Sequence, residues 1–398
     1  MNGDALNIWF SESMSNVGVA STSPQGCDLS DVTVIIPSYK RQAFILRQFV
    51  YWSASSAEVL VMDGSPEPLS EKCQEILNGF PRLCYLHSPT SFCERLRLAS
   101  QSIRTAYSIM LADDEFHLFE GLYAALSRLQ TANATSADTV GCIGQSLRFN
   151  FDVGINGITI GQGYPHANFE VVGRNIKDRL NFAMDDYTPA TCYALLTSSC
   201  WSETWGSLES WSCPYATELQ QALMTYICGK LVSVDKVYWM RSMKLEPVSI
   251  KGEFDRNVFF IDWWTERRYR AEKNKFIKIL TQFLMAKEGS SYGAASSKIN
   301  EAIEIYIAIS IPTTSKFSRN IKFKLQYLIN ATFGQSVYEL ARKIYKVFTG
   351  GTYQAPPRFH PLVEYFARID GQSLQKSECF TSELSNIEDL VTHFYQSY

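Results

Sequence analysis

The residues best suited to chemistry in this sequence are three consecutive carboxylates, Asp113, Asp114 and Glu115, which follow an apolar segment at 107–111. The apolar segment predicts a buried strand, so the carboxylates stand together where a buried element ends. Like charges held this close repel one another, and a divalent metal or a group of basic side chains normally compensates them. The cluster therefore predicts a site that handles phosphates.

Apolar strands and helices alternate around this cluster. Strands are predicted at 32–36, 58–62, 83–86, 107–111 and 139–143, and helices at 41–52, 68–77, 92–106 and 120–129. Short apolar strands separated by helices are typical of right-handed βαβ units and of a parallel sheet covered on both faces. We therefore predict an α/β fold with a doubly wound, mostly parallel sheet.

Polar residues follow four of the predicted strands: Pro37, Ser38 and Tyr39 after the first, Asp63 after the second, residues 87–89 after the third and the carboxylate cluster after the fourth. Ligands of such sheets bind beyond the carboxyl ends of the strands. These four positions are therefore expected to share one rim of the sheet.

The turn after the first strand has no glycine, and the sequence contains no GxxxxGK(S/T) motif. A backbone loop that cradles phosphate is therefore not expected. Metal and cationic side chains would have to neutralise the phosphates, and the carboxylate cluster and the segment with Arg95 and Arg97 would supply both.

Segments 32–41, 59–65 and 109–116, in this order and spacing, resemble the nucleotide-sugar-binding half of family-2-type glycosyltransferases of the GT-A fold. They are most similar to the bacterial domain whose metal motif reads Ala-Asp-Asp-Asp/Glu. The resemblance is good over residues 31–145, weaker to about 245 and absent beyond. It implies transfer of a sugar, with inversion, from a nucleotide diphosphate-sugar donor to a saccharide or lipid-linked glycan acceptor in bacterial capsule or O-antigen synthesis.

The resemblance also implies roles for individual residues. Mg²⁺ or Mn²⁺ would bind Asp114 with Asp113 or Glu115 and stabilise the leaving nucleoside diphosphate. Ala112 stands where the usual Asp-x-Asp motif begins, so the pair that holds the metal stays open. The expected donor-binding residues are Pro37, Ser38, Tyr39, Arg41, Asp63, Arg95, Asp113 and Arg241.

An inverting transfer needs a general base beside the acceptor hydroxyl. Glu218, expected in the first turn of a helix at 215–228, is the candidate, and Asp185 and Asp186 are its rivals. Three tryptophans are either sugar-stacking platforms or, as is more common, core residues: Trp201, Trp205 and Trp211.

Composition narrows the class of protein. A net charge of −3 gives no reason to expect nucleic-acid binding. Ten cysteines without a CxxC pair suggest reduced thiols and a cytoplasmic protein, and neither a secretory signal nor an apolar run of about 18 residues is found. The basic stretch 316–346 is either the solvated face of a helical layer or a peripheral contact with the inner membrane surface.

The predicted organisation has three parts. Residues 1–30 form a poorly ordered N-terminal lead or edge extension. Residues 31–245 form the GT-A-like domain, with a nucleotide-sugar half at 31–145 and an acceptor half of mixed strands at 146–245, including a hairpin around 154–157 and a strand at 189–196. Residues 246–398 are mostly helical, with one of the helices predicted at 263–286.

Two alternatives to a glycosyltransferase remain. A sugar-1-phosphate nucleotidyltransferase would also use acidic metal ligands on a parallel sheet, but the first turn lacks its Gly-rich basic triphosphate loop. A catalytically inactive saccharide-binding protein on the same scaffold is kept open by Ala112.

Overall fold

The computed structural model of the protein describes residues 3–20, 26–163, 169–185, 187–243, 258–310, 359–369 and 377–397. The first half of the chain contains, in order, α1 (Gly3–Ala20), β1 (Val32–Ser38), α2 (Gln42–Trp52), β2 (Glu58–Asp63), α3 (Glu71–Leu77), β3 (Leu83–His87), α4 (Phe92–Ser102), β4 (Tyr107–Met110), β5 (Phe116–His117), α5 (Phe119–Thr135), β6 (Thr139–Asp152) and β7 (Gly157–Gln162).

The second half contains fewer strands and more helices. In order they are α6 (Ile176–Asp185), β8 (Leu195–Thr197), α7 (Ser198–Thr204), α8 (Pro214–Cys228), β9 (Lys230–Ser242), α9 (Phe260–Thr265), α10 (Arg270–Glu288), α11 (Tyr292–Ser310), β10 (His360–Pro361), α13 (Leu362–Ile369) and α14 (Glu378–Ser397). Short 3-10 helices lie at Pro189–Tyr193, Trp205–Ser207 and Arg267–Tyr269.

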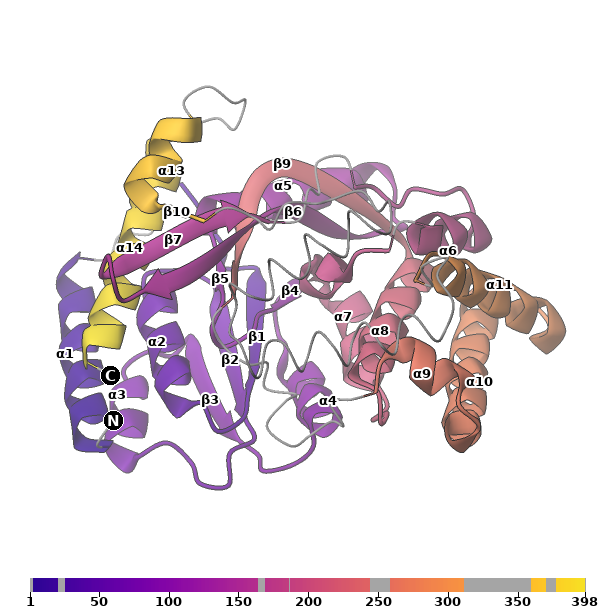
Figure 1. The fold of residues 1–398 in the computed structure, drawn as a ribbon, viewed down its shortest axis with the longest axis horizontal. Helices are drawn as coiled ribbons and strands as arrows, with labels where there is room; N and C mark the ends of the chain where they lie inside the picture. Colours follow the sequence, from indigo (N-terminus) through magenta and orange to yellow (C-terminus); the bar gives the residue numbers. More distant parts are fainter. Residues whose placement is uncertain are drawn as a thin grey trace, which may run out of the picture.

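The described strands form one sheet in the order β10-β7-β6-β8-β4-β1-β2-β3, and β9 pairs with β5 and β6 (Figure 1). β3, β2, β1 and β4 are mutually parallel, as the alternation of strands and helices predicted. β8 and β7 pair antiparallel with their neighbours, whereas β6 and β9 run parallel. The predicted α/β class, the mixed strand directions within 146–245 and the hairpin around 154–157 are confirmed.

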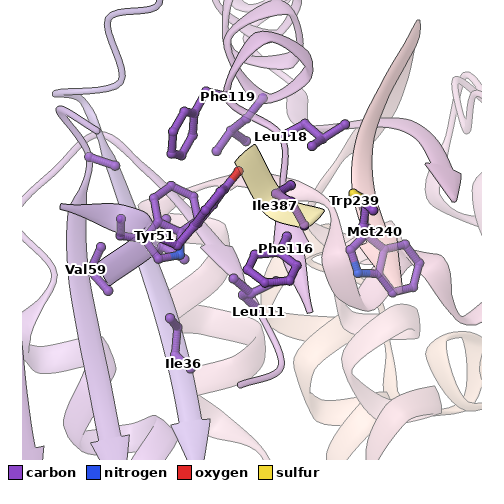
Figure 2. Close-up of a cluster of buried hydrophobic side chains, with 14 of the residues drawn as sticks. Ile36, Tyr51, Val59, Leu111, Phe116, Leu118, Phe119, Trp239, Met240 and Ile387 are labelled. Atoms are coloured by element: carbon purple, nitrogen blue, oxygen red, sulfur yellow. The ribbon is translucent and has the colours of Figure 1, made fainter. Parts of the chain in front are cut away.

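Side chains of successive residues in the parallel strands pack into two separate hydrophobic cores. In β1, Val34 and Ile36 belong to the core that includes α2 and α5, whereas Ile35 faces the core that includes α4 and α8. Such alternation is expected for a strand covered on both faces, because neighbouring side chains point to opposite sides. Figure 2 shows Ile36 and Val59, and Tyr51 of α2, among the side chains of the first core. The sheet is therefore doubly wound.

The two ends of the chain pack beside the parallel half. Residues 1–30 were expected to form a poorly ordered lead or an edge extension, but residues 3–20 form the helix α1, whose Trp9 and Phe10 are buried in the first core. α14 contacts the same region and carries Ile387 into that core, as Figures 1 and 2 show. Contacts between segments more than 350 residues apart thus complete this core.

Two other predictions differ from the structure. Residues 189–196 were predicted as a strand, but Pro189 opens a 3-10 helix and only Leu195–Thr197 pair in the sheet. The single helix predicted at 263–286 is divided between α9 and α10, because Glu266 is extended. The basic stretch 316–346 lies outside the described residues. Within the described part of the chain, none of the helices has both the length and the apolar character needed to cross a membrane.

Candidate functional site

The ends of β1, β2 and β4 bring the predicted site residues to one rim. Ser38 and Asp63 are register partners at the ends of β1 and β2, and the Gly64 N–H donates to the Ser38 carbonyl at 2.9 Å. The Ser38 hydroxyl donates to Asp113 Oδ2 at 2.5 Å, which joins this rim to the carboxylate cluster after β4. The convergence expected for the ends of parallel strands is present.

Arg41 pairs with two members of the carboxylate cluster. Its Nη1 lies 2.9 Å from Asp113 Oδ1, and its Nη2 lies 2.8 Å from Asp114 Oδ2. Arg41 immediately precedes α2, and Lys40 before it has a positive φ of 56°, a strained conformation for a residue other than glycine. The Lys40 N–H donates to Ser65 Oγ at 2.8 Å, which ties this turn to the loop after β2. The turn is therefore held in the shape that delivers Arg41 to the carboxylates.

Burial and ion pairing have opposite effects on the pKa of Asp113. Burial raises the pKa of the Asp113 carboxyl, and the neighbouring Arg41 charge and the Ser38 hydrogen bond counteract this shift. Burial lowers the pKa of Arg41, but attraction by Asp113 and Asp114 outweighs it and the net shift is upward. Arg41 thus supplies the positive charge that the carboxylate cluster required.

Glu115 is held by the other half of the sheet. Trp239 on β9 donates its indole N–H to Glu115 Oε2 at 2.7 Å, and Arg241 Nε lies 4.0 Å from Oε1. Burial raises the pKa of Glu115, Asp114 raises it further, and Arg241 acts against both. The Gln48 side chain on α2 donates to the carbonyl oxygens of Asp113 and Glu115, at 3.0 and 2.7 Å. The backbone of the carboxylate cluster is therefore fixed as well as its side chains.

The candidate base Glu218 lies within electrostatic range of the same arginine. Its Oε1 accepts a hydrogen bond from the Tyr187 hydroxyl at 2.9 Å. Burial raises the pKa of Glu218, whereas the Tyr187 hydrogen bond and the Arg241 charge lower it. Arg241 thus lies 4.0 Å from Glu115 and also acts electrostatically on Glu218.

Glu218 lies in the second turn of α8 and not in the first, because the helix begins at Pro214. The helix dipole acts mainly within the first turn, so it does not account for this glutamate. Of the two rival bases, Asp185 ends α6 with an exposed side chain, and Asp186 lies outside the described residues.

Asp63 and Arg95 form a second group at the rim. Asp63 accepts from the Ser65 N–H at 2.9 Å and from the Tyr85 hydroxyl at 2.8 Å. Arg95 is fully buried and donates to the Thr90 carbonyl. A Cβ at Gly64 would lie 2.0 Å from Arg95 Nη1, so the guanidinium packs directly against this glycine. The structure places Arg95 beneath the β2 loop, and a direct contact of Arg95 with a diphosphate stays a prediction.

The two remaining donor candidates flank Ser38. Pro37 lies within β1, opposite Met62, so the strand extends beyond the residue predicted to end it. Tyr39 is partly buried, and Lys40 Nζ lies 4.9 Å from the centre of its ring.

The carboxylates as placed do not fit a divalent metal. Both oxygens of Asp113 and one of Asp114 contact Arg41 or Ser38, and Glu115 is held by Trp239. Among the described residues, no group of three or more His, Cys, Asp or Glu side chains is arranged to hold a metal ion. Binding of the predicted Mg²⁺ or Mn²⁺ at Asp113 and Asp114 would therefore require displacement of Arg41.

The three tryptophans proposed as alternatives for sugar stacking are core residues, with exposed fractions of 0% for Trp201, 6% for Trp205 and 4% for Trp211. Sequence reasoning missed a different aromatic pair. The rings of Tyr215 and Phe259 stack at an interplanar angle of 17°, and both are more than 40% exposed. Tyr215 lies one turn before Glu218 on α8. This spacing from the candidate base is the feature by which the sequence could have indicated Tyr215.

No protein-family model matches the chain, and its sequence has no significant match among curated proteins. A search of solved structures finds distant similarity to S. aureus TarS. TarS 1–349 has a TM-score of 0.40 and 14% identity over 69% of this chain and 88% of that chain. Its complex with UDP-GlcNAc has a TM-score of 0.40 and 12% identity over 69% and 89%. For a longer TarS structure the values are 0.38 and 14%, over 69% of this chain and 54% of that one.

Proposed function

We propose that the protein is a glycosyltransferase that moves a sugar from a nucleoside diphosphate-sugar donor to a saccharide acceptor. The observation that carries this proposal is the convergence of Ser38, Arg41 and the carboxylate cluster at the ends of β1 and β4. Arg241, which lies 4.0 Å from Glu115 and acts electrostatically on Glu218, supports including the candidate base in the same site. The resemblance of segments 32–41, 59–65 and 109–116 to family-2-type enzymes supports the same class.

The proposed reaction is a single displacement. The acceptor hydroxyl oxygen attacks the anomeric carbon of the donor sugar and forms the new glycosidic bond. The bond from that carbon to the diphosphate oxygen breaks, and the nucleoside diphosphate leaves with the electron pair. Glu218 takes the proton of the hydroxyl, and a pKa raised by burial makes its carboxylate a better proton acceptor. One displacement inverts the anomeric centre.

Developing charge on the leaving diphosphate needs fixed positive charge. Arg41 and Arg241 lie beside the carboxylate cluster and supply it. The nucleoside is proposed to bind beside Ser38 and Asp63, at the ends of β1 and β2.

The acceptor is proposed to lie against Tyr215 and Phe259. Exposed aromatic rings bury the apolar face of a sugar, and this pair lies one helical turn from Glu218. A saccharide or lipid-linked glycan of a bacterial surface polysaccharide is the acceptor class implied by the resemblance. Peripheral membrane contact through 316–346 belongs to the same proposal.

A nucleoside diphosphate screen tests this function. UDP, GDP, CDP and ADP, their sugar conjugates including UDP-GlcNAc, the corresponding triphosphates with and without a sugar 1-phosphate, and free saccharides are each added in EDTA, Mg²⁺ and Mn²⁺. We expect one diphosphate and its sugar conjugate to raise the Tm. Preference for a triphosphate with a sugar 1-phosphate would favour the nucleotidyltransferase, and stabilisation by saccharides alone would favour an inactive binding protein. No stabilisation by any nucleotide would rule out the donor site.

A further inference from the structure

We infer that Arg41 takes the place of a divalent metal in this site, so that a nucleoside diphosphate binds beside Asp113 and Asp114 without Mg²⁺ or Mn²⁺. The inference rests on the proposed donor site and concerns only the cation that neutralises the diphosphate there.

Arg41 bridges the two carboxylates that a metal would bridge. Two separate guanidinium nitrogens contact the two side chains, at 2.9 Å to Asp113 and 2.8 Å to Asp114. The second oxygen of Asp113 accepts from Ser38. Oxygen ligands are what Mg²⁺ and Mn²⁺ require, and these are already in contact with a cation or a donor. A metal at Asp113 would have to displace the guanidinium.

Displacement of Arg41 is unfavourable because of where the side chain lies. The residue is 6% exposed, and its guanidinium carbon lies 4.8 Å from the centre of the Phe44 ring. A charge separated from its partners in such surroundings loses the compensation that allowed its burial. The aromatic contact also favours a planar guanidinium at this position over a hydrated ion.

A second arginine adds to the local positive charge. Arg47 on α2 is 1% exposed, and its guanidinium carbon lies 4.8 to 5.2 Å from the ring centres of Phe44, Phe116 and Phe394. Burial lowers the pKa of Arg47 to about 10, so the side chain stays charged at neutral pH, and the carboxylates of the cluster favour that charge.

The carboxylate cluster is therefore balanced by protein groups. Arg41 pairs with Asp113 and Asp114, Arg241 lies near Glu115 and Arg47 adds charge nearby, so a divalent ion bound alone would add positive charge to a site that already holds three arginines. A diphosphate, in contrast, meets cations that are fixed before it arrives and need no reorganisation.

The first test uses the wild-type protein. The affinity for UDP, GDP, CDP and ADP is measured by calorimetry in EDTA and in Mn²⁺, and Mn²⁺ binding is followed by electron paramagnetic resonance with and without each nucleotide. We expect the affinity of the preferred diphosphate to agree within about twofold between the two conditions, and no tightly bound Mn²⁺.

The second test removes the guanidinium. In Arg41→Ala, we expect the affinity in EDTA to fall about tenfold or more, and Mn²⁺ to restore it by binding the released carboxylates. Arg41→Lys keeps one charge without the two-pronged contact and should give an intermediate affinity. Arg128→Ala is the control, because Arg128 is an exposed arginine on α5 paired with Glu170.

The outcomes distinguish a failure of the role inferred for Arg41 from a failure of the proposed donor site. Binding of a diphosphate by the wild type only with Mn²⁺ overturns the role of Arg41 and leaves the donor site intact. No binding under either condition overturns the proposed function itself. If Arg41→Ala does not fold, the wild-type comparison and Arg41→Lys still decide between Arg41 and a metal.

Discussion

The indole of Trp239 donates a hydrogen bond to Glu115, with 2.7 Å between Nε1 and Oε2. This contact joins β9 of the second half of the chain to the carboxylate cluster after β4. The other carboxylate oxygen of Glu115, Oε1, lies 4.0 Å from Arg241 Nε. The two halves of the chain therefore share the site, and neither forms it alone.

Replacement of Trp239 by phenylalanine should destabilise the protein. The buried Glu115 carboxylate would lose a donor that solvent cannot replace, and we expect a cost of about 1–3 kcal/mol in the free energy of unfolding. Chemical denaturation measures this change. Trp264→Phe is the control, because Trp264 is partly buried on α9, away from the carboxylates. An equal loss in both variants would show that the Glu115 contact contributes nothing specific.

Glu218→Gln should separate binding from transfer. The amide keeps the size of the side chain and its place beside Tyr187 but cannot accept the acceptor proton. We expect the donor affinity to remain near that of the wild type and kcat to fall by about 10²-fold or more. Asp185→Asn is the comparison, since Asp185 is exposed at the end of α6. Full activity in Glu218→Gln together with a loss in Asp185→Asn would transfer the role to Asp185.

The parallel half was readable from the sequence because its signals are local. Apolar runs such as 32–36 and 58–62 pair as neighbouring strands, and their ends meet at one rim because the strands are parallel. The position of Asp113 beside Ser38 follows from that geometry.

The sequence did not reveal which cation faces the carboxylates. Arg95, expected at the diphosphate, packs against Gly64, whereas Arg41, also among the expected donor-binding residues, pairs with the carboxylates. The direction of a long side chain depends on packing from distant segments, which periodicity does not report. The same limit applies to α1, because the partners of Trp9 include Phe394 near the other end of the chain.

Truncation of the aromatic pair should affect the acceptor alone. In Tyr215→Ala or Phe259→Ala, we expect the KM for the acceptor to rise about tenfold while the donor affinity stays unchanged, because an exposed stacking surface is lost. Steady-state kinetics with each substrate varied in turn measure the two effects. Tyr123→Ala, an exposed tyrosine on α5, is the control. A higher KM for the donor would place the pair in the donor site.

Stability should fall as the pH rises through the titration of Glu383. This α14 side chain accepts from the Tyr51 hydroxyl at 2.8 Å, and burial raises its pKa from the ordinary 4.5 to about 7. Between these values the folded state binds more protons than the unfolded state, so the free energy of unfolding decreases by about 3 kcal/mol as the pH rises from below 4.5 to above 7. Glu383→Gln should remove this part of the pH dependence and raise the Tm at pH 8 relative to the wild type. Glu378→Gln, which alters an exposed residue of the same helix, should leave it in place. Identical Tm profiles for wild type and Glu383→Gln between pH 5 and 8 would contradict the assignment.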